Sequence, residues 1–132
     1  MEIVEHEGKT LAMIIRKDKK FDETSFITPE HYPLQAGILV YPKGHKVKAH
    51  AHNAMEKNVS ATQEILFVKR GSAVAELFNS DGEMVAEKEL NEGDIIFLAD
   101  CGHGFRIKED SEIFEIKQGP YAGHESDKRM LE

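Results

Sequence analysis

The sequence predicts an all-β fold, and three observations support this prediction. Short runs rich in Ile, Val, Phe and Leu recur about every 8 to 12 residues, a spacing typical of a β-sandwich or barrel. Turn-forming residues separate the runs: Asn79-Ser80-Asp81-Gly82 is a strong hairpin signal, and Asn91-Glu92-Gly93-Asp94 and Gly71 indicate two further turns. No segment has the sustained periodicity of an amphipathic helix.

The individual strands follow from the chain in order. Two apolar runs open the sequence, and residues 17–33 are polar and end at a proline, which predicts a long surface excursion. Residues 53–61 are compatible with a loop or with one helical turn, and beyond them the apolar runs are separated by turn signals. The expected strands are Glu2–His6, Thr10–Lys17, Gln35–Pro42, His45–His52, Thr62–Lys69, Ser72–Phe78, Glu83–Leu90, Asp94–Ala99, Gly104–Lys108 and Glu112–Lys117.

The length of 132 residues is that of one domain. Hydrophobic residues make up 40% and charged residues 31%, which is an ordinary composition for a globular chain and argues against a disordered one. We therefore expect a single domain over residues 1–132, with its core at about 35–118. The first strands lie within residues 2–17, and residues 119–132 form a charged tail.

The charge balance excludes two classes of partner. Lys and Arg number 17 against 24 Asp and Glu, so the net charge is −7. Binding to phosphates requires a concentrated positive surface, so we expect neither nucleic acid nor an anionic membrane as the partner.

The sequence also predicts a cytoplasmic location. Cys101 is the only cysteine, which excludes an intramolecular disulfide. The N-terminal residues are too acidic for a signal peptide. The longest apolar runs, such as residues 95–99, are far shorter than the roughly 20 residues of a membrane helix.

Histidines are the residues most suggestive of chemistry. His45, His50 and His52 lie close together, and His103 follows much later between two glycines. On a strand, His50 and His52 at positions i and i+2 point to the same face, where they can act as two ligands of one metal ion. An exposed polar face is the alternative interpretation of this pair.

The residues around these histidines resemble the two signatures of the cupin superfamily. The matching residues are Gly44, His50-Ala51-His52, Glu64 and Gly71 in the first signature, then Gly93-Asp94 and Cys101-Gly102-His103-Gly104-Phe105 in the second. The resemblance implies a single-domain double-stranded β-helix, that is, a jelly-roll barrel. Thr62-Gln63-Glu64 and the closing stretch from Ile116 are similar to small stand-alone cupins that accompany sugar-nucleotide and polysaccharide genes.

The resemblance also implies a metal site. The ligands that the family pattern assigns are His50, His52, Glu64 and His103. Residues 53–63 separate His52 from Glu64, a longer gap than is usual in the family, so Glu56 and Gln63 remain alternative ligands. Imidazoles with one carboxylate suit a divalent transition metal such as Zn, Fe, Ni or Mn.

We therefore expect a divalent-metal-binding cupin that binds or transforms a small polar molecule, sugar-like or keto-acid-like, inside the barrel. Glu56 or Lys48 would move a proton if the chain is an enzyme. The alternatives are a non-catalytic binding or sensing cupin and a metal-free sugar isomerase in which histidines act as acid and base. Cys101 is interpreted as a small buried hydrophobe, and the N-terminal strands suggest a homodimer by analogy with other cupins.

Overall fold

The computed structural model describes residues 1–131, with the backbone alone at Ser126, and it divides into two compact units. Unit 1 consists of residues 1–19 and 63–131, and unit 2 of residues 20–62. The single domain over residues 1–132 stays a prediction.

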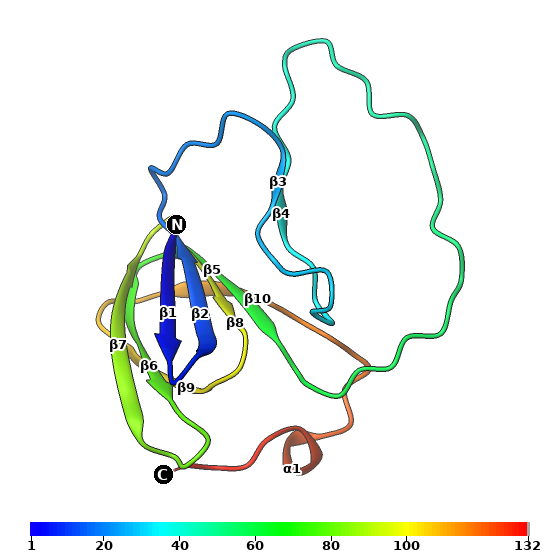
Figure 1. Cartoon of the computed structure of the whole chain (residues 1–132). Helices are drawn as coiled ribbons and strands as arrows, with labels where there is room; N and C mark the ends of the chain where they lie inside the picture. Colours follow the sequence, from blue (N-terminus) through cyan, green and yellow to red (C-terminus); the bar gives the residue numbers. More distant parts are fainter. Residues whose placement is uncertain (132) are drawn as a thin grey trace. The chain divides into compact units, whose positions relative to one another are not determined.

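Unit 1 is built from two antiparallel sheets, which confirms the predicted all-β fold class (Figure 1). The five-stranded sheet has the order β1-β2-β8-β5-β10 and the three-stranded sheet the order β7-β6-β9. A single helical turn, α1 (His124–Asp127), follows the last strand and was not expected from the sequence. The strands are β1 (Glu2–His6), β2 (Lys9–Ile15), β5 (Glu64–Arg70), β6 (Ser72–Phe78), β7 (Met84–Asn91), β8 (Ile95–Leu98), β9 (Gly102–Ile107) and β10 (Glu112–Lys117).

The chain passes repeatedly from one sheet to the other, as the strands of a jelly roll do. Three of these crossings join β5 to β6, β7 to β8 and β9 to β10, and the chain also changes sheet between β8 and β9. Hydrogen bonds join the bends: the Gly93 N–H donates to the Val68 carbonyl at 2.8 Å, and the Ser72 N–H donates to Ser111 Oγ at 3.1 Å. Among the described residues the two sheets stay separate in their strand pairing, so they do not close into a barrel.

Alternation along the strands places the core of unit 1 between the two sheets. Leu66 and Val68 of β5 and Ala75 and Leu77 of β6 are buried, whereas residues between them along the strands are more exposed. This pattern defines which side chains point inward, and it determines the position of the candidate site described below. The core cluster comprises Val4, Leu11, Ala12, Ile14, Leu66, Val68, Ala75, Leu77, Leu90, Ile96 and Leu98.

Unit 2 departs from the sequence prediction. Its only strands are β3 (Ser25–Phe26) and β4 (Gly37–Ile38), which pair with each other, and residues 39–62, all of them described, form no strand. The prediction of a strand over His45–His52 is therefore wrong. Lys and His alternate there with Val and Ala, and even Val47 is exposed, so this stretch has no apolar face whose burial would stabilise strand pairing.

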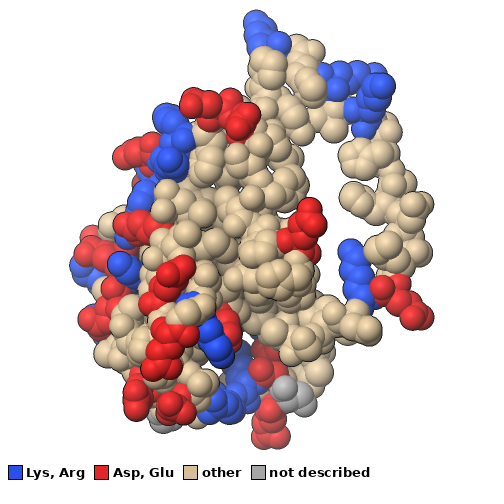
Figure 2. All heavy atoms as spheres, in the orientation of Figure 1, with Lys and Arg blue, Asp and Glu red and all other residues tan. Residues whose placement is uncertain are grey.

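Charged side chains of both signs are interspersed on the face of unit 1 seen in Figure 2. Several form ion pairs on the outer face of the three-stranded sheet: Arg106 Nη1 lies 3.0 Å from Glu76 Oε2 and 2.6 Å from Glu87 Oε1. Lys108 Nζ lies 2.9 Å from Glu89 Oε1. None of the helices in the described part of the chain has the length and apolar character needed to span a membrane.

Candidate functional site

Glu64 and His103, which are 39 positions apart in the sequence, meet inside unit 1. Glu64 is the first residue of β5 and shares the inward face of that strand with Leu66. His103 of β9 pairs with the buried Leu77 of β6, so its side chain points inward from the other sheet. His103 Nε2 lies 3.0 Å from Glu64 Oε2, and the side chains are 30% and 7% exposed. The sequence prediction placed both residues in one site, and the structure brings them together.

The Glu64 carboxylate is buried, charged and incompletely satisfied. The interaction with His103 lowers the pKa of Glu64, burial opposes this shift, and the interaction with Glu115 and the nearby charge of Lys117 support it. Among the described residues, no donor is aligned to give Oε2 a hydrogen bond, although the His103 nitrogen is within ion-pair distance. A buried carboxylate oxygen with an unused acceptor position is unfavourable unless a cation or a donor fills it.

Strand β10 adds two charged groups to the same interior face. Lys117 pairs with Glu64 across the β5–β10 ladder, and Glu115 pairs with Leu66, so both point to the side on which Glu64 lies. Lys117 Nζ lies 3.1 Å from Asp127 Oδ2. The site is therefore a polar cluster at one end of the apolar core.

Cys101 packs against the core cluster near this site. Burial raises the pKa of its thiol to about 12, and the negative charges of Asp100 and Glu64 contribute to the increase. A thiol with this pKa stays protonated at neutral pH and is a poor nucleophile. This environment agrees with the interpretation of Cys101 as a small buried hydrophobe.

The other two predicted ligands belong to unit 2. His50 and His52 are exposed on an extended segment, and their ring centroids are 5.4 Å apart. The Nδ1 atom of His50 lies 2.9 Å from the Lys48 carbonyl oxygen. The side chains of Lys48 and Glu56, the candidates for proton transfer, are exposed on the same segment. Within residues 1–131, no three His, Cys, Asp or Glu side chains gather into a group that could hold a metal ion.

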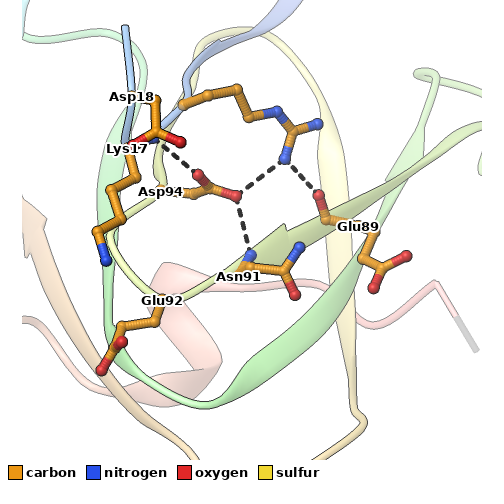
Figure 3. A pocket seen from close by; sticks show the side chains of 7 residues that line it. Lys17, Asp18, Glu89, Asn91, Glu92 and Asp94 are labelled. Carbon is orange, nitrogen blue, oxygen red and sulfur yellow. Dashed lines mark hydrogen bonds and ion pairs between the residues drawn. The ribbon is translucent and has the colours of Figure 1, made fainter.

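A second polar site of unit 1 surrounds Asp94 and was not singled out as a site from the sequence (Figure 3). It borders a pocket of about 550 Å³. Asp94 accepts hydrogen bonds from the N–H groups of Lys17 and Asn91, at 3.0 and 2.9 Å, and from Arg16 Nη1 at 3.0 Å. These three hydrogen bonds connect the turn between β7 and β8 to the residues that follow β2, so Asp94 stabilises this turn. The signal for it in the sequence is the turn Asn91-Glu92-Gly93-Asp94.

Comparison of the chain with protein-family models, with curated proteins and with solved structures finds no match.

Proposed function

We propose that this chain is a cupin that binds a divalent transition metal and, with it, a small polar molecule. The observation that supports this proposal best is the buried, charged Glu64, whose Oε2 has an unused acceptor position beside His103. Burying a carboxylate is costly unless a cation or hydrogen-bond donors compensate for its charge. A divalent ion bound by Glu64 and His103 would supply this compensation, and the two residues fit such an ion by donor type.

The remaining ligands come from the sequence pattern. His50 and His52 are assigned to the same ion because they form the His-x-His part of the first cupin-like signature. Their rings meet edge to face in unit 2, with centroids 5.4 Å apart. Glu56 and Gln63 are the alternatives to Glu64. Neutral imidazoles with a carboxylate favour Zn, Fe, Ni or Mn. When bound, the ion would act as a Lewis acid toward an oxygen of the ligand.

The charged groups on β10 would then orient the ligand. Lys117 points to the same interior face as Glu64, and its ammonium can attract an oxygen atom of a sugar-like or keto-acid-like molecule. Lys48 or Glu56 is the proposed group for proton transfer. A non-catalytic binding or sensing role uses the same groups without a reaction. The cytoplasmic location and the homodimer remain part of the proposal.

The Glu64–His103 contact also favours a second candidate function, metal-free acid–base catalysis. A carboxylate that holds an imidazole at 3.0 Å is the usual arrangement of a histidine general base. Metal content separates the two proposals, because only the first requires an ion.

A titration with Zn²⁺ tests the metal-binding proposal. We expect Glu64→Gln to weaken Zn²⁺ binding by at least about 100-fold, because a carboxylate ligand is replaced by a neutral amide. The matched control is Glu56→Gln, which makes the same change at an exposed residue of unit 2 and should alter the affinity by less than about twofold. Isothermal titration calorimetry on the whole chain measures both variants.

The other outcomes are equally informative. A loss confined to Glu56→Gln would make Glu56 the carboxylate ligand. Wild-type protein that binds no Zn²⁺, Ni²⁺ or Mn²⁺ but turns over a sugar or keto acid would support the acid–base candidate. Binding that is the same in both variants and in the wild type would contradict a metal site at Glu64.

A further inference from the structure

The segment that follows β10, residues 119–131, passes through α1 to the C-terminal end of the chain (Figure 1, orange to red). Its contacts reach Lys117, which pairs with Glu64, and Gly102, which precedes His103. We call this segment the C-terminal strap. It leaves β10 next to Lys117, forms the single turn α1, and ends near the turn between β6 and β7. Two groups of contacts attach it to unit 1.

The first attachment is the ion pair between Lys117 and Asp127. Nζ and Oδ2 are 3.1 Å apart, and the two side chains are only 22% and 18% exposed. The Lys117 ammonium also lies 5.5 Å from the centroid of the Tyr121 ring, within the range of a cation–π contact. Because Lys117 points inward beside Glu64, this pair fixes the strap at the mouth of the polar cluster.

The second attachment lies at the end of the strap. The side chain of Leu131 packs directly over Gly102, which has no side chain in the way, and Gly102 is the residue immediately before His103. Arg129 Nη2 donates to the Ser80 carbonyl at 3.3 Å, in the turn between β6 and β7. The strap is thus held on both sides of the end of unit 1, and most of its described residues are exposed to solvent.

We propose that the strap is a gate over the Glu64–His103 site, with the Lys117–Asp127 pair as its latch. A segment with few buried contacts can open locally without unfolding of the whole domain. The closed strap borders the polar cluster, where the His103 side chain is 30% exposed, and opening it would widen the access for a ligand. The inference uses the site of the proposed function but requires no bound ion, so it can be tested separately.

Cys101 provides a built-in reporter of the open state, because its thiol is a poor nucleophile while it is buried and should react faster once opening exposes it to solvent. It is the only cysteine of the chain, it is partly buried, and it precedes Gly102, on which Leu131 packs. The test measures the rate at which Cys101 of the metal-free chain reacts with small iodoacetamide and with a bulky poly(ethylene glycol) maleimide. The variants are Asp127→Asn and the double change Asp127→Asn with Leu131→Ala.

The control is Glu112→Gln, which removes an ion pair of similar kind at the other end of β10. Glu112 lies 3.3 Å from Arg70 and 3.9 Å from Lys69, and all three side chains are exposed. Thermal unfolding of each variant is recorded in parallel, so that a faster reaction caused by general instability is recognised.

We expect Asp127→Asn to accelerate the reaction with the bulky reagent, and the double variant to accelerate it by at least about fivefold, with a smaller effect on iodoacetamide. Glu112→Gln should leave both rates within about twofold of the wild type. Unchanged rates in the double variant would overturn the gate. An equal acceleration in Glu112→Gln would also overturn it, since the effect would then not be specific to the strap.

Discussion

Replacement of Gly71 by alanine is expected to destabilise the chain by about 4 kcal/mol or more. Gly71 has a φ of +93°, a conformation that L side chains rarely adopt, at the bend between β5 and β6. A Cβ atom there would overlap Ser111 Oγ and the carbonyl oxygen of Asp110, which belong to the facing bend between β9 and β10. Relieving the overlap requires separation of two bends that hydrogen bonds join, so both sheets would be disturbed.

Gly8→Ala is the matched control for this prediction. Gly8 also has a positive φ, of 78°, but a Cβ atom there would meet no atom within 4 Å. Its substitution therefore isolates the backbone strain, about 1 kcal/mol. Urea unfolding of the two variants measures the difference, and equal losses of stability would contradict the close approach of the two bends.

Replacement of Asp94 by alanine is the second large effect, with an expected loss of about 3 kcal/mol. The Asp94 side chain is 6% exposed and holds Arg16 and the N–H groups of Lys17 and Asn91. Without it, these donors lose their acceptor, and the turn before β8 loses its connection to the end of β2. Asp18→Ala, at an exposed residue of the same pocket, should change the stability by less than about 0.5 kcal/mol.

Asp94 also makes the stability of the fold depend on pH. Burial alone would raise the pKa of Asp94, but the N–H groups of Asn91 and Lys17, together with the Arg16 guanidinium, lower it below its usual value. A carboxyl with a lowered pKa in the folded state stabilises the fold above its unfolded pKa of about 3.9, and this contribution disappears as the pH falls through the folded pKa. The stability difference between wild type and Asp94→Asn should therefore shrink below about pH 4. A difference that is constant from pH 7 to pH 2 would contradict the charged state of Asp94.

The strands of unit 1 could be predicted because each has an alternating apolar face bounded by turn residues. Glu2–His6, Ser72–Phe78 and Glu112–Lys117 have the predicted bounds, and the other strands of unit 1 shift by one or two residues at their ends. His45–His52 could not be predicted correctly from its pattern. Its alternation is between polar and small residues. Such a pattern predicts which residues share a face, but small side chains bury too little apolar surface to stabilise a strand within a sheet.

The candidate site was predictable only in part. The meeting of Glu64 and His103 depends on the pairing of β5 with β8 and of β6 with β9. The sequence predicted that the two residues share a site only because each lies in a motif that resembles a cupin signature. The contributions of Lys117 and Glu115 depend on the register between β10 and β5, which no local pattern specifies. The ion pair of Lys117 with Asp127 depends on a helical turn that four residues of sequence do not predict.

The X-ray absorption spectrum of the Zn²⁺-loaded chain tests the central claim, a metal ion held by Glu64 and histidines, most directly. The ligand set His50, His52, Glu64 and His103 predicts a first shell of nitrogen and oxygen atoms at about 2.0–2.1 Å, with the outer-shell scattering of about three imidazole rings. A sulfur atom at about 2.3 Å would instead make Cys101 a ligand. The proposed site would be contradicted by such a sulfur ligand, by a first shell without imidazole scattering, or by a chain that takes up no zinc.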